Sequence, residues 1–406
     1  MKKTLIAVAA AAALTATSAF AEITFGAWLR VITGVGSNGE DVVMGTTNSW
    51  GGVRPARLNA AGTSEDGKAG FKLDFYFEND EIWGHDHDIR IGDNGYLWVK
   101  PIDQIQLSIG KFDGGETGLR GDFCYGSWNW LRPFNWIADD EGLTFKGSHK
   151  DGLMARITPI DNLVVLVQLP VMNAKWGGNN AGYVKKTETE DAKNTAADVF
   201  KNAAYMASYT IEGVGTLKAG FFGADDEKTV EGKKYNQTGT VNVAFDLNAI
   251  ENLYVTVGAF FDIADKEMGE WHEKMKFTAG ASYQVSDAMK FSVSGGYVKY
   301  MDKCSWLGNK DNAFGIGAGV DYVIMDGLTL NADVRYKNVG YGKKGDDGSV
   351  SFLAGVVKSV GGNASLQAGF QGSTNGCGLV QADTGIPAVE KDDFVWAIPV
   401  GLSVFF

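Results

Sequence analysis

The stretch "GFKLDFYFEND", residues Gly70–Asp80, alternates between two kinds of side chain. One parity is wholly apolar and consists of Phe71, Leu73, Phe75 and Phe77. The other parity is polar and mostly charged, and consists of Lys72, Asp74, Tyr76 and Glu78. Successive side chains of a β-strand point to opposite faces of a sheet, so the segment predicts a strand with one apolar and one polar face. The apolar face must meet either a second sheet, as in a soluble sandwich, or lipid.

The same alternation recurs along the chain. It is clearest in "TVNVAFDLN", "MKFTAGASYQV", "MKFSVSGGYVKY", "LTLNADVRYKN" and "ASLQAGFQG", which begin at residues 240, 275, 289, 328 and 364. Segments of about ten residues with a period of two are typical of transmembrane β-barrel strands. Lipid cannot satisfy backbone N–H and C=O groups, so only helices or a closed sheet can span a bilayer. The segments therefore favour an all-β, antiparallel transmembrane barrel.

The connections between these segments alternate in length. Short turns follow Pro101, Pro159, Ser286, Met325 and Gly361. We expect the long polar loops at residues 34–52, 79–93, 113–141, 171–200, 224–237, 264–273, 301–311, 339–348 and 373–393. Short turns on one side and long loops on the other are typical of outer-membrane barrels. The pattern predicts about 18 strands, with 16 as the alternative. These strands form one domain spanning residues 22–406. Only one membrane-crossing strand is assigned around residue 150, at Leu153–Thr158.

The N-terminal residues carry an export pattern. Lys2 and Lys3 precede an apolar run from Leu5 to Leu14, and Ala19-Phe20-Ala21 provides a small-x-small cleavage site. This pattern predicts a cleaved signal peptide at residues 1–21. After it, no apolar run reaches the ~18 residues that a spanning helix needs. We therefore expect an exported protein of the bacterial outer membrane.

The C-terminal stretch "FVWAIPVGLSVFF" places Trp396, Ile398, Val400, Leu402, Val404 and Phe406 on one parity. It resembles the C-terminal assembly signal of bacterial outer-membrane barrels, with Gly401, Val404 and the terminal Phe406 as the signal residues. The resemblance implies that outer-membrane lipid and the outer-membrane assembly machinery are partners.

Composition excludes some functions. The net charge is −12 and no basic stripe is present, which argues against nucleic acid as a partner. The three cysteines allow one bridge, Cys304 with Cys377, and a leftover thiol at Cys124, or three unpaired thiols. No metal-ligand spacing or cofactor motif is found, and "GHDHD" at residues 84–88 reads as a solvated loop. No serine stands in a nucleophile-elbow context, so we expect no enzyme and no cofactor.

The polar parity of the predicted strands provides candidate pore-lining residues. They are Arg30, Arg57, Lys72, Asp74, Arg156, Lys290, Asp333 and Arg335. Further charged side chains of this parity are Lys218, Asp246, Asp262, Lys276 and Asp321. Charged rings set the ion preference of pores, and the excess of bases indicates a mild anion preference. The alternative is that these residues only solvate the wall.

The long loop at residues 113–141 provides a candidate constriction. In its architecture, the chain resembles general bacterial porins, whose long third surface loop folds into the barrel. The resemblance implies that loop 113–141 also folds inward. It assigns no role to any individual residue of the loop. The charged members Asp113, Glu116, Arg120, Asp122 and Arg132 could set a field across the pore. The aromatic members Trp128, Trp130, Phe134 and Trp136 could stack on sugars or pack against the wall.

The sequence thus predicts a porin: a water-filled channel for passive diffusion of small hydrophilic solutes and ions. A sugar-selective channel of the same fold is one alternative, and a surface adhesin or host-binding barrel is another. The resemblance to porins also leaves a homotrimer open.

Overall fold

The computed structural model describes residues 22–37, 41–47, 56–77, 89–112, 152–170, 196–230, 233–265, 273–304, 309–338, 348–374 and 394–406. The first strands are β1 (Glu22–Ser37), β2 (Val42–Thr47), β3 (Ala56–Thr63), β4 (Ala69–Phe77), β5 (Ile89–Ile102), β6 (Ile105–Lys111), β7 (Gly152–Ile157), β8 (Leu163–Pro170) and β9 (Ala204–Ile211). The remaining strands are β10 (Gly215–Val230), β11 (Lys233–Ile250), β12 (Leu253–Ala264), β13 (Glu273–Ser286), β14 (Met289–Cys304), β15 (Lys310–Met325), β16 (Leu328–Lys337), β17 (Ser349–Ser359), β18 (Ala364–Ser373) and β19 (Val395–Phe405). The described helix is α2 (Ala196–Lys201), and no described helix is long and apolar enough to cross a membrane.

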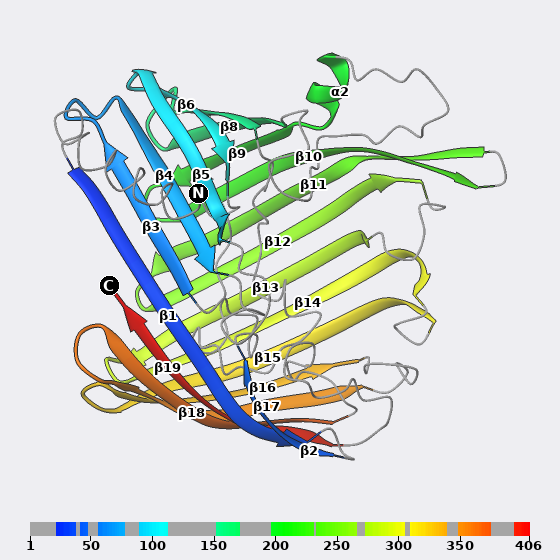
Figure 1. The fold of residues 1–406 in the computed structure, drawn as a ribbon. Coiled ribbons are helices and arrows are strands. Elements are labelled where there is room, and N and C mark those ends of the chain that lie inside the picture. The colour runs from blue at the N-terminus through cyan, green and yellow to red at the C-terminus, as the bar shows by residue number, and fades with distance from the viewer. Residues whose placement is uncertain are drawn as a thin grey trace.

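The strands form one antiparallel sheet that closes on itself (Figure 1). Strands adjacent in sequence pair from β3 through to β19, and β1 joins the two ends by pairing with both β19 and β3. At the seam, the register places Trp28 opposite Phe405 and Glu22 opposite Thr63. Closure gives each described strand other than β2 a paired neighbour on both sides, which satisfies the backbone of these strands within the barrel wall.

β2 and β3 share one position in this wall. β3 pairs with the first half of β1, from Glu22 to Leu29, and β2 pairs with the second half, from Ile32 to Ser37. The 19 described strands therefore make an 18-strand barrel, which confirms the predicted count over the 16-strand alternative.

The barrel has an inverted distribution of side chains. Large apolar residues face outward, as shown by Phe291 at 48% and Leu97 at 60% exposure. Polar residues of the opposite parity are shielded inside, as shown by Asp74 and Thr256 at 0% exposure. A soluble protein hides its apolar residues and exposes its polar ones, so this pattern fits a wall between hydrocarbon and a polar interior. Phe71, Leu73 and Phe75 of the opening stretch lie on the outward parity, opposite to Asp74.

The predicted short turns are confirmed. The five short turns join β5–β6, β7–β8, β13–β14, β15–β16 and β17–β18. The expected loop at 224–237 is wrong for most of its length, because β10 continues to Val230 and β11 begins at Lys233. This hairpin extends beyond its neighbours at the long-loop end (Figure 1). Strand residues also occupy part of the expected loops at 34–52 and 301–311. Polar composition misled the prediction because strands that rise above the bilayer no longer need an apolar face.

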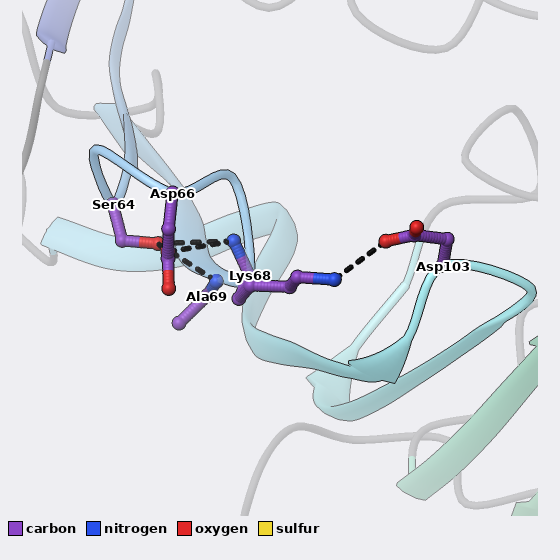
Figure 2. A network of polar contacts seen from close by, with 5 residues as sticks. All are labelled: Ser64, Asp66, Lys68, Ala69 and Asp103. Atoms are coloured by element: carbon purple, nitrogen blue, oxygen red, sulfur yellow. Dashed lines mark hydrogen bonds and ion pairs between the residues drawn. The ribbon is translucent and has the colours of Figure 1, made fainter.

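Two neighbouring turns at the short-turn end are joined by an ion pair (Figure 2). Lys68 Nζ lies 2.5 Å from Asp103 Oδ1, which connects the β3–β4 turn to the β5–β6 turn. Within the first turn, Ser64 Oγ donates to Asp66 Oδ1 at 2.6 Å and accepts the backbone N–H of Ala69 at 2.9 Å. Lys68 lowers the pKa of Asp103, and the hydrogen bond from Ser64 lowers the pKa of Asp66. Both carboxylates stay ionised and help to define a tight turn.

Charge placed on the outer wall should destabilise the barrel according to depth. Ile316 lies midway along β15 and is 52% exposed, whereas Ile324 lies near its turn on the same parity. We expect Ile316→Lys to lower the free energy of unfolding by ~2–4 kcal/mol, and the control Ile324→Lys by ~0–1 kcal/mol. Denaturant titration in lipid vesicles measures both. Equal, negligible effects would mean that this wall faces water.

Candidate functional site

The inner wall near β3 and β4 holds a buried carboxylate with several partners. Arg57 Nη2 lies 2.6 Å from Asp74 Oδ2, and the Asp74 side chain is 0% exposed. Asn94 donates to the same oxygen from its backbone N at 3.1 Å and from Nδ2 at 2.8 Å. The Arg57 guanidinium also lies over the ring of Tyr76, 5.5 Å from its centroid. The predicted lumen residues Arg57 and Asp74 are therefore joined in one network, in which each fixes the other.

A second inner cluster links three neighbouring strands, β10, β11 and β12. Lys218 Nζ lies 2.5 Å from Asp246 Oδ2. Thr256 Oγ1 donates to Asp246 Oδ1 at 2.6 Å, so both carboxylate oxygens have a partner. All three residues are buried. Buried ions require such paired arrangements, because desolvation of an isolated charge costs several kcal/mol.

The inner face of β16 carries three charged residues in alternation, Asp333, Arg335 and Lys337. Arg335 Nη2 lies 3.7 Å from Asp333 Oδ2. Their cross-strand partners on β15 are Gly319, Gly317 and Gly315, which carry no side chain. The glycines leave room beside the long basic side chains. Asp333 and Arg335 are thus on the inner wall together with Lys337, which shares their polar parity in the sequence.

The structure places some of the other candidate lumen residues, and others lie outside the part that it describes. Three of them lie on strands and are half-buried: Lys72, Arg156 and Lys290. Asp321 accepts a hydrogen bond at 2.8 Å from Asn331, which lies on the inner face of β16. Arg30 lies in β1, but its side chain is outside the described part of the structure. All residues of loop 113–141, including the charged and tryptophan candidates, also lie outside the described residues, as do residues 84–88. Among the residues described, no cluster of His, Cys, Asp or Glu could hold a metal ion.

Two other sequence predictions fall at strand ends. β19 places Val404 opposite Leu29 and Ala364, and Gly401 opposite Ile32. Phe406 is 78% exposed on the outward parity, and its backbone N donates to the Ala27 carbonyl at 2.8 Å. Cys304 is buried at the end of β14, whereas Cys377 and Cys124 lie outside the described residues. The Cys304–Cys377 bridge therefore stays a prediction.

The inner wall also contains an apolar patch that the sequence analysis missed. Its buried members are Phe112, Met154, Leu166, Ala204, Met206 and Ala244. Leu166 is 0% and Phe112 is 1% exposed, although their strands alternate with outward-facing apolar residues. The signal was present in "LVVLVQLP" at Leu163–Pro170, where both parities are apolar. A strand that is apolar on both faces must be covered on both, and lipid covers only one of them.

The closed antiparallel barrel, its apolar exterior and its charged interior define the class of outer-membrane β-barrel channels. A family model described as Gram-negative porin matches residues 7–342, and the chain belongs to this family. It is a channel for passive diffusion of small solutes across the bacterial outer membrane.

A solved porin structure shows the same fold. The anion-selective porin from Comamonas acidovorans has a TM-score of 0.55 and 15% identity, over 95% of this chain and 99% of that chain. The outer-membrane channel DcaP of Acinetobacter baumannii has a TM-score of 0.46 and 11% identity, over 95% of this chain and 97% of that chain. No curated protein sequence matches.

Removing one partner of the Lys218 pair should cost stability. Asp246→Asn leaves the buried Lys218 ammonium without its counter-ion, and we expect a loss of about 3 kcal/mol in unfolding free energy. The double variant Lys218→Met with Asp246→Asn should be more stable than the single variant, because no isolated charge is left. Urea unfolding of the four members of this mutant cycle measures the coupling. A coupling near zero would show that the pair is solvated rather than shielded.

Proposed function

We propose that the channel is passive, without a catalytic step or cofactor, and that it mildly prefers small anions. The observation that carries this proposal is the excess of bases on the described inner wall. The bases are Arg57, Lys72, Arg156, Lys218, Lys276, Lys290, Arg335 and Lys337. The acids on the same face include Asp74, Asp246, Asp262, Asp311, Asp321, Asp333 and Glu273, and Glu273 Oε1 lies 3.2 Å from Lys276 Nζ. Fixed charges on a pore wall raise the local concentration of the opposite ion.

Single-channel recording in planar bilayers tests this proposal. We expect steady conductance steps and a reversal potential in a salt gradient that favours the anion. Arg335→Gln should lower the anion-to-cation permeability ratio by about fourfold, because one charge at ~10 Å in water changes the local concentration of each ion about twofold and in opposite directions. Lys358→Gln is the matched control, because Lys358 is exposed on the outward parity of the adjacent strand β17. Absence of conductance would overturn the channel assignment, and equal shifts in both variants would remove Arg335 as a determinant.

We further propose that loop 113–141 enters the barrel and rests on the inner apolar patch. The support is that the chain leaves the patch at Phe112, which directly precedes the loop, and returns to it at Met154, two residues after the start of β7. The loop also carries the aromatic residues Trp128, Trp130 and Trp136, which suit an apolar seat. In this arrangement its charged residues Asp113, Glu116, Arg120, Asp122 and Arg132 would face the inner-wall bases.

Weaker contact between the loop and the inner apolar patch should change the single-channel conductance. Leu166→Ser removes apolar contact at the centre of the patch, and we expect a larger, noisier single-channel conductance as the loop loosens. Ser292→Ala, on the inner parity of β14 and away from the patch, is the control. An unchanged conductance in Leu166→Ser, with normal folding on heated and unheated gels, would contradict the inward position of the loop.

The remaining proposals concern processing and assembly. We propose that residues 1–21 are removed, which N-terminal sequencing should show as a start at Glu22. We also propose that the assembly machinery recognises Phe406.

We further propose a homotrimer with β2 at the contact between subunits. Within the described residues β2 pairs with β1 alone, and Val42 and Met44 on it are 66% and 83% exposed. Native mass spectrometry of wild type and Met44→Glu tests the trimer, which the variant should weaken.

A further inference from the structure

The lipid-facing wall has a recess across β12–β15, bounded by aromatic side chains. Its floor is made by Ala279 and Ala281 on β13 and by Gly295 on β14. Ala279 lies directly opposite Gly295 in the sheet register, so the small residues are contiguous across two strands. Val257 and Ile316 flank this floor from β12 and β15, and the recess has a volume of about 660 Å³. We call this feature the lipid-side recess.

The recess lies outside the barrel rather than in the lumen. Its floor residues share the parity of Phe277 and Phe291, which are 44% and 48% exposed. The intervening residues Lys276, Thr278 and Ser294 are buried on the inner parity. The recess therefore belongs to the wall that faces hydrocarbon, and its contents must be hydrocarbon or another apolar surface.

Aromatic cross-strand pairs lie at one end of the recess and just beyond the other. Phe277 pairs with Tyr297 and lines one end, whereas the other end is lined by Ala281 and Val293. The Tyr283–Phe291 pair lies on the next outward row, just beyond this second end. The lining of β13 runs from Phe277 to Ala281, four residues and therefore roughly 13 Å along a strand. With a strand tilt of ~40°, this corresponds to roughly 10 Å of depth, which is about a third of the ~30 Å hydrocarbon core. Tyr283 lies close to the short β13–β14 turn, so the recess opens into the leaflet on the short-turn, periplasmic side.

We infer that the lipid-side recess is a binding site for one acyl chain of a periplasmic-leaflet glycerophospholipid. A second barrel is a poorer occupant, because its broad wall would rest on the projecting aromatic rims and leave the floor uncovered. Such a void loses the dispersion contacts of the atoms that line it. A flexible chain can lie between the rims and contact the floor along its length. The depth of the recess, roughly 10 Å, also lies within one leaflet of hydrocarbon. This inference is independent of ion preference and of loop 113–141.

Filling the floor tests the site. The variant Ala279→Leu with Ala281→Leu raises the floor without touching the inner wall. Gly295 is left unchanged, because a Cβ there would lie 3.0 Å from the Gly315 carbonyl oxygen. The control is Ala332→Leu with Ala354→Leu, a directly paired couple on the lipid face of β16 and β17 that lies outside the recess. Both variants add the same atoms to the same kind of surface.

The measurement is native mass spectrometry of protein released from palmitoyl-oleoyl phosphatidylethanolamine nanodiscs, followed through serial detergent dilution. We expect wild type and control to retain one phospholipid, and the filled variant to retain it about tenfold more weakly after losing contact with roughly two methylenes. Equal retention in all three proteins would overturn the site. Loss of oligomer in the filled variant, with lipid retention unchanged, would also overturn it and assign the recess to a protein interface. If the double variant does not fold, Ala281→Val alone gives the same comparison.

Discussion

The constraint on which this structure depends is the need to pair every backbone N–H and C=O group within hydrocarbon. An open sheet would leave two unpaired edges in lipid, at several kcal/mol for each unsatisfied group. The seam strand β1 removes both edges by pairing with β19 on one side and with β2 and β3 on the other. Closure then creates two environments, and every strand must present an apolar face to one and a polar face to the other.

This two-sided requirement explains why so much of the fold could be predicted. A period of two is a local property, and Phe71, Leu73 and Phe75 show it without reference to distant residues. The strand number followed from the alternation of short and long connections. The prediction failed where the bilayer no longer imposes the pattern: the β10–β11 hairpin continues to Val230 and Lys233 with charged residues on strand positions. Above the membrane, hydrogen bonding alone maintains a strand.

The inner wall was less predictable because polar parity does not specify partners. Sequence placed Arg57 and Asp74 on one face, but their pairing depends on the β3–β4 register, which puts Arg57 opposite Tyr76 and leaves Asp74 one row away. Lys218, Asp246 and Thr256 come from three strands, and only the assembled sheet brings them together. Apolar residues such as Leu166 were overlooked because an aqueous channel was expected to be lined by polar side chains alone.

Each face of the wall is therefore matched to the medium that it contacts, which is polar on the inside and hydrocarbon on the outside. On the inside, buried ions are tolerated because neighbouring strands supply counter-ions and hydrogen bonds, as Arg57 and Asn94 do for Asp74. On the outside, shape replaces charge, because in hydrocarbon only packing distinguishes one apolar contact from another. Small residues between the Phe277–Tyr297 and Tyr283–Phe291 pairs therefore create specificity where no polar group is available. The same strands therefore present paired charges to the lumen and a shaped apolar surface to the lipid.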